Sequence, residues 1–91
     1  MKPFSVKQFE LAMWAQKTIY EEQIEGYSKV AAKVGRKVAL ALLIATLKKV
    51  VAEKFHPKPA GESFEQKIAR EAKIDRMVFG LLLSKGIVKM D

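Results

Sequence analysis

The fold of this 91-residue chain is decided by residues 38–47, which read VALALLIATL. They form the longest uncharged apolar run in the sequence. At the helical turn of about 100° per residue, their large side chains point in nearly every direction, and a helix that is apolar all round is buried all round. The run predicts either the central helix of a bundle or a seam between copies, formed by Leu40, Leu43, Ile44 and Leu47.

Helix-start and helix-stop signals lie on both sides of this run. Ser5 with Gln8, and Ser63 with Gln66, match the capping box, in which a hydroxyl and an amide satisfy free backbone N–H groups. The stretch 56–61 contains two prolines, which disfavour helix in the residues before them and predict a linker. The sequence therefore predicts an all-α fold: a four-helix single domain over residues 1–91, with a Pro-containing linker between the second and third helices. The expected helices are at about 5–25, 28–55, 63–73 and 76–85.

Two glycines and a set of regularly spaced apolar residues add detail to the helices predicted in the first half of the chain. Phe9, Met13 and Tyr20 recur at helical spacing in the first predicted helix, and the methionines are expected to serve the core. Gly26 is expected to stop that helix. Gly35 lies within the second predicted helix, where it is expected to bend the helix or permit a close crossing.

The composition argues against several classes of protein. There is no cysteine and one histidine, so disulfides are excluded and no metal-binding spacing exists. No nucleophile and base are spaced for catalysis, and we expect neither an enzyme nor a cofactor. A membrane-spanning helix needs about 20 apolar residues, so the run at 38–47 is too short to span a membrane. Binding to a membrane surface is not expected either, because the apolar residues of this segment are spread round the helix and not gathered on one face. These features favour a cytoplasmic protein.

The net charge of +7 is concentrated in the middle of the chain. Residues 28–58 carry eight basic residues and one acid, whereas the flanking segments are nearly neutral. A segregated field of one sign attracts a polyanion or an acidic surface. We expect phosphate contacts from one helical stripe and two further lysines: Lys29, Lys33, Arg36, Lys37, Lys48 and Lys49. The alternative is a solvated face that pairs with the glutamates of the first helix.

Residues 66–86 read QKIAREAKIDRMVFGLLLSKG. Ala69 is small enough to let the two helices predicted in this segment cross closely, and Asp75 can cap the second of them. Apolar residues occupy the packing positions: Ile68, Ala72, Ile74, Phe79 and Leu82. The segment resembles the helix-turn-helix of bacterial repressors. In that resemblance Arg76 is the one residue of the exposed face able to contact a base, although the position usually held by glycine is Lys73. We also expect Arg76 and Lys85 to contact phosphates.

Two classes of function follow from the sequence. The first is a small basic nucleic-acid-associated protein that contacts phosphates and reads few bases, because base-reading side chains are scarce. The alternative is a helical protein–protein interaction module: an adaptor, an inhibitor or an assembly subunit, of the kind found in phages and mobile elements. Its interface would combine the apolar run with Met77 and Leu81, and its partner would be an acidic protein surface or another copy of the chain.

Overall fold

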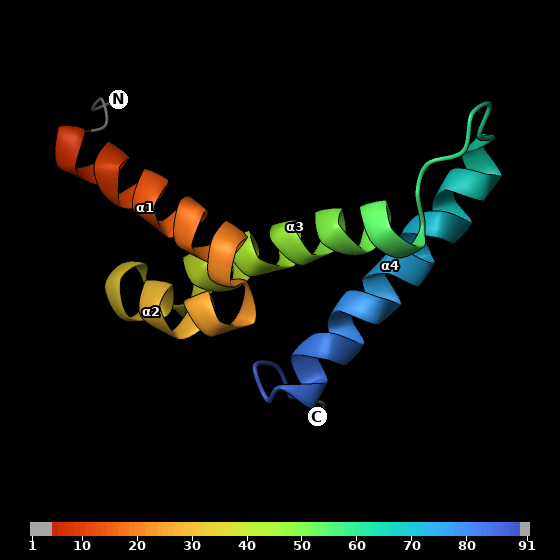
Figure 1. The fold of residues 1–91 in the computed structure, drawn as a ribbon. Helices are drawn as coiled ribbons and strands as arrows, with labels where there is room; N and C mark the ends of the chain where they lie inside the picture. The colour runs from red at the N-terminus through yellow and green to blue at the C-terminus, as the bar shows by residue number, and fades with distance from the viewer. Residues whose placement is uncertain (1–4, 90–91) are drawn as a thin grey trace. The chain divides into compact units, whose positions relative to one another are not determined.

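The structure is a computed structural model that describes residues 5–89, among which there are four α-helices and no strand (Figure 1). The all-α class is confirmed. The helices are α1 (Val6–Glu22), α2 (Ile24–Val34), α3 (Arg36–Phe55) and α4 (Phe64–Ser84). The chain divides into two compact units, of which the first ends at Thr46 and the second begins at Leu47. Each unit is described by itself, and a single domain over residues 1–91 stays a prediction.

Both predicted capping boxes are confirmed. At the start of α1, the Gln8 backbone N–H donates to Ser5 Oγ and the Ser5 N–H donates to Gln8 Oε1, both at 3.1 Å. At the start of α4, the matching bonds between Ser63 and Gln66 are 3.2 and 3.0 Å. These bonds satisfy donors that a helix start otherwise leaves unpaired, which fixes where each helix begins.

The prediction that Gly26 ends the first helix is wrong. Helix α1 ends at Glu22, and the chain turns at Gln23, which has a φ of 51° and a ψ of −117°. Gly26 lies within α2 and is buried. A Cβ at that position would lie 2.7 Å from the Thr18 carbonyl oxygen, so glycine is there because α1 and α2 cross closely.

The predicted helix over 28–55 is also divided. Gly35 has a φ of 94° and a ψ of 157°, a conformation essentially confined to glycine, and it separates α2 from α3. The sequence indicates a bend at this position, and the structure has a complete break. As a consequence, the basic residues before and after Gly35 belong to two different helices.

The two helices predicted at 63–73 and 76–85 are one continuous helix in the structure, α4. Lys73 is helical, because good helix formers precede it and no glycine supplies a turn. Asp75, expected to cap a separate helix, lies inside α4, where its carboxylate pairs with Lys48 Nζ at 3.2 Å. The turn that a helix-turn-helix requires is therefore not formed here.

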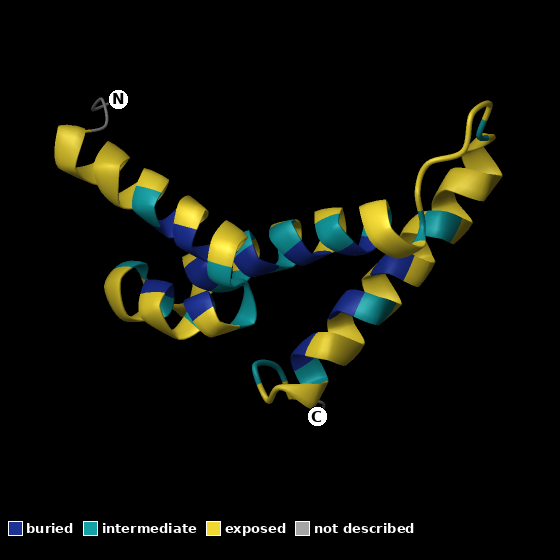
Figure 2. Ribbon diagram, in the orientation of Figure 1, coloured by how far each residue is buried: buried dark blue, intermediate teal, exposed yellow. Residues whose placement is uncertain are grey.

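The two units bury separate sets of apolar side chains (Figure 2). The first unit buries residues of α1, α2 and the first half of α3: Ala15, Ile19, Val30, Ala39 and Leu43. The second unit buries residues of the last half of α3 and of α4: Leu47, Val51, Ile74, Val78 and Leu82. Each core is small, so much apolar surface stays exposed on the helices.

Candidate functional site

Helix α1 carries an exposed row of large apolar side chains. Val6 is 73% exposed, Phe9 60%, Met13 54% and Tyr20 61%. Their spacings of three, four and seven residues place all four on one face of a helix. We call this face the α1 stripe. The expectation that Met13 serves the core is wrong in the structure, because the core uses a different face of the helix.

The opposite face of α1 supplies the core of the first unit. Ala15, Thr18 and Ile19 are buried, and they lie on the far side of the helix from Met13 and Tyr20. Residues 6–13 are exposed throughout (Figure 2). Helix α1 is therefore apolar on two sides, of which only one is covered within its own unit.

The α1 stripe follows the seam pattern of a coiled coil. Val6, Met13 and Tyr20 are spaced by seven residues, and Phe9 and Gln16 occupy the intervening positions. No charged residue interrupts this seam. Glu10 and Lys17 flank it on one side, and both are exposed. A helix pair with such a seam excludes water along its length and uses the flanking charges to select its partner.

An apolar groove of about 500 Å³ adjoins this helix in the first unit. Leu11, Ala12 and Ala15 line it from α1, and Val38 and Leu42 line it from α3. Val38, predicted to be buried as part of the apolar run, is half exposed. The apolar surface available to a partner thus continues from the α1 stripe around the helix.

Helix α4 offers a second exposed apolar row, but a charged pair interrupts it. Phe64, Ile68 and Phe79 are exposed on one face. Asp75 lies on the same face between Ile68 and Phe79, and it is paired with Lys48. A partner covering this row would have to desolvate that pair, which is unfavourable.

Two residues of the predicted basic stripe are engaged within the first unit. Lys29 Nζ lies 2.7 Å from Glu22 Oε1, and this hydrogen bond raises the pKa of Lys29. Lys33 Nζ lies 4.6 Å from the centre of the Trp14 ring, within the range of a cation–π contact. The alternative expectation, that the basic residues pair with the glutamates of the first helix, therefore describes Lys29.

The other predicted phosphate-binding residues are all exposed. Arg36 and Lys37 begin α3, and Lys49 follows on the same helix, whereas Arg76 and Lys85 belong to the second half of the chain. Among the described residues, none of these five has an ion-pair partner within 4.0 Å. The stripe predicted along one helix is not formed, because the break at Gly35 places Lys29 and Lys33 in α2 and Arg36 and Lys37 in α3.

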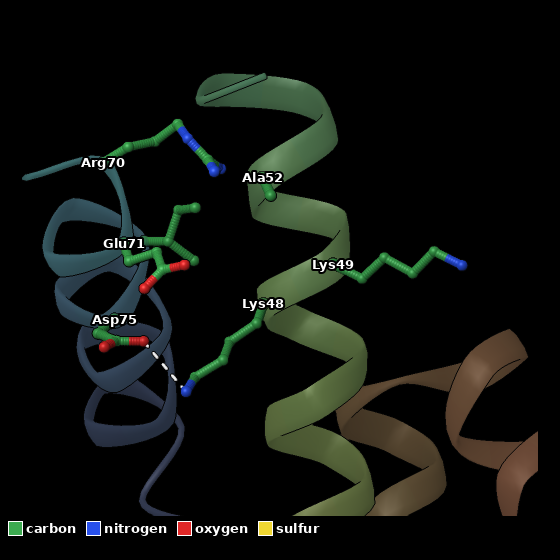
Figure 3. A pocket seen from close by; sticks show the side chains of 7 residues that line it. Lys48, Lys49, Ala52, Arg70, Glu71 and Asp75 are labelled. Carbon is green, nitrogen blue, oxygen red and sulfur yellow. Dashed lines mark ion pairs between the residues drawn. The ribbon is translucent and has the colours of Figure 1, made fainter. Parts of the chain in front are cut away.

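A pocket of about 410 Å³ in the second unit brings Lys48, Arg70 and Asp75 together (Figure 3). Figure 3 shows Lys48 reaching Asp75, while Lys49 points away from α4. The carboxylate of Glu71 lines the same pocket. Because Lys48 is paired with Asp75 and Arg70 with Glu62, the pocket has little capacity for a further anion.

A second ion pair of the second unit, between Arg70 and Glu62, is structural. Arg70 Nε donates to Glu62 Oε2 at 2.7 Å and Nη2 donates to Oε1 at 3.2 Å, which makes the pair bidentate. The Glu62 side chain is 2% exposed and that of Arg70 is 17% exposed. The hydrogen bonds from Arg70 hold the pKa of Glu62 below its usual value. This pair fixes the loop after the two prolines to α4.

The predicted apolar interface is only partly available. Leu43 and Leu47 are buried, so their assignment to an interface between copies is corrected. Leu40, Ile44 and Met77 are partly buried, and Leu81 is exposed. The surface that sequence reasoning missed is the α1 stripe, whose helical spacing was visible but which looks like a core face.

Comparison of the chain with protein-family models, curated proteins and solved structures found no match. None of the helices within residues 5–89 is both long and apolar enough to cross a membrane. Over the same residues, no three histidine or carboxylate side chains lie together as metal ligands.

Proposed function

We propose that this chain is a helical protein-interaction module that pairs with an apolar helix through the α1 stripe. The observation that carries the proposal is the exposure of Val6, Phe9, Met13 and Tyr20 along one face. Contiguous exposed apolar surface on a small protein is typical of a binding site. A helix that lies along such a row buries it at i, i+3 and i+7 spacing.

The charge of α1 favours a protein partner over a membrane or a nucleic acid. Within Val6–Glu22 there are two lysines and three glutamates, so the helix is slightly acidic. Helices that lie on anionic bilayers usually carry a lysine- and arginine-rich polar face. Phosphate backbones likewise require cations, which α1 does not supply in excess.

The proposal can be tested with a helical peptide as the probe. A fluorescent amphipathic peptide with leucine at every seam position and neutral flanks is titrated with the protein, and binding is followed by anisotropy. We expect binding that the double variant Phe9→Gln/Met13→Gln weakens at least tenfold, because it removes two large apolar contacts of the stripe.

The matched control is Phe64→Gln/Ile68→Gln on α4. It makes the same kind of change at the same four-residue spacing, on the row that Asp75 interrupts. We expect this control to leave peptide binding unchanged, with the helical circular dichroism signal of both variants retained. Binding that is lost in the α4 variant and kept in the α1 variant contradicts the proposal.

A second candidate function rests on exposed cations that have no ion-pair partner among residues 5–89. Arg36, Lys37 and Lys49 are exposed, and phosphate contacts by such residues release counterions. We propose weak, sequence-independent contact with nucleic acid as an additional property of the chain. Arg76 and Lys85 remain proposed contributors, and the expected cytoplasmic location stays a prediction.

Salt dependence tests this second candidate. Anisotropy of a fluorescent mixed-sequence DNA duplex is measured from low to physiological salt. The log of affinity is expected to fall linearly with the log of salt concentration, and Arg36→Ala/Lys37→Ala is expected to reduce the slope by about 2. The peptide-binding assay provides the control, because α1 is unchanged in that variant. Absence of binding at low salt removes the candidate.

A further inference from the structure

We infer that the helix that pairs with the α1 stripe is α1 of a second copy of this chain, in antiparallel orientation. This inference rests on the proposed function and names its partner. It is carried by the arrangement of two exposed charges beside the seam, Glu10 and Lys17, which are seven residues apart on the same flank. That arrangement is complementary to itself only when the two helices run in opposite directions.

The seam and its flanking charges together fit an antiparallel pair in one register. With Met13 level with Gln16 of the second copy, Phe9 lies level with Tyr20 of the second copy. Both pairs occur twice, as a two-fold interface requires. The two aromatic pairs close the ends of the seam, and the flexible Met13 and Gln16 fill its centre.

The same register brings opposite charges together. Glu10 lies level with residue 19 of the second copy, so Lys17 of that copy is displaced by two residues, or about 3 Å along the axis. Long side chains cover that distance. In a parallel pair in register, this flank of one helix faces the opposite flank of the other, so Glu10 and Lys17 would lie against the uncharged Ser5 and Ala12 and gain no attraction. The charges therefore select the antiparallel pair.

The size of the interface predicts a weak dimer. Helix α1 has 17 residues and a length of about 25 Å. At their exposed fractions, Phe9 and Tyr20 each present about 100 Å² to a partner. The four residues of the α1 stripe together offer on the order of 400 Å² per copy, which is below the standard size for a stable complex. We expect a dissociation constant for the dimer between about 10 µM and about 1 mM.

Charge exchange tests the inference with the full chain. Mass is measured by sedimentation equilibrium over that concentration range for the wild type, Glu10→Lys, Lys17→Glu and the double exchange. Each single variant turns two attractive contacts into two repulsive ones and is expected to weaken the dimer roughly tenfold. The double exchange restores the pairs and is expected to regain the wild-type affinity.

Two further samples sharpen the test. A mixture of the two single variants is expected to dimerise more tightly than either alone, because each antiparallel mixed pair regains both attractions. Glu21→Gln is the control for Lys17→Glu: it removes the Lys17–Glu21 contact within the helix, 4.0 Å in length, and leaves the contacts between copies intact. It is expected to dimerise like the wild type.

The outcomes separate this inference from the proposed function. A monomer at every concentration that still binds the leucine peptide overturns the pairing of copies and leaves the proposed function standing. A monomer that binds no peptide overturns both. A dimer that is indifferent to the charge variants overturns the antiparallel register. A dimer lost in the single variants and regained in the double exchange and in the mixture supports the inference.

Discussion

Replacing Gly26 with alanine tests whether α1 and α2 cross as closely as the structure shows. The added Cβ would lie 2.7 Å from the Thr18 carbonyl oxygen and 3.1 Å from the Cβ of Glu22. The first of these atoms belongs to the backbone of α1, so it cannot rotate away as a side chain would. The two helices must therefore separate at the point where Ile19 and Val30, both fully buried, lie in the core of the first unit.

The sign of the effect follows from two opposing terms. Alanine in a helix is favoured over glycine by about 1 kcal/mol. Overpacking of a closely packed contact costs about 1–3 kcal/mol, and more where the backbone must shift. We expect Gly26→Ala to lower the free energy of unfolding of the first unit by about 1–2 kcal/mol, because the overpacking exceeds the gain in helix propensity.

Gly80→Ala is the matched control. Gly80 lies inside α4, and a Cβ there meets no atom within 4 Å. The same substitution is then expected to raise stability by about 0.5–1 kcal/mol through helix propensity alone. The two glycine-to-alanine changes should therefore differ in sign.

Urea unfolding measures both effects. Trp14, the single tryptophan of the chain, lies in α1, so its fluorescence reports on the first unit, while circular dichroism reports on all helices. The urea midpoint from fluorescence should fall for Gly26→Ala, while the slope of the unfolding free energy against urea concentration stays unchanged. A Gly26→Ala variant that is as stable as the wild type, or more stable, refutes the close crossing.

Three further predictions concern the turn, the cap and the buried ion pair. Gln23→Gly should raise the free energy of unfolding by about 1 kcal/mol, because Gln23 holds a positive φ that glycine adopts without strain. The urea midpoint measured by fluorescence should rise accordingly, and a lower midpoint contradicts the turn. Ser63→Ala should lower the stability measured by circular dichroism by about 1 kcal/mol, since it removes the hydroxyl that accepts from the Gln66 N–H, and a change near zero would show that the cap contributes little. The pKa of Glu62 is lower in the folded chain than its usual 4.5, so its stabilisation is present above that value and is lost as the pH falls through the folded pKa. Acid titration followed by circular dichroism should therefore show a shallower loss of stability for Glu62→Gln than for the wild type, and equal slopes would contradict an ionised Glu62–Arg70 pair.

The sequence determined the helical class and the starts of two helices, because these depend on local interactions. A capping box involves residues three apart, and it is formed at both predicted places. The two prolines similarly predict the non-helical segment before α4, which the structure contains. Signals of this kind need no knowledge of what lies elsewhere in the chain.

The ends of the helices and the exposed surfaces were decided by tertiary structure. Gly26 looks like a helix stop, yet it lies inside α2 because α1 passes close to it, a contact that local sequence does not encode. Phe9 and Met13 have the spacing of a core face, but periodicity gives only the side of the helix they share and not whether anything covers it. Lys29 belongs to a basic segment in the sequence, and folding places it against Glu22. Spacing along a chain fixes which residues face the same way, whereas burial and pairing depend on which distant segments the fold brings opposite them.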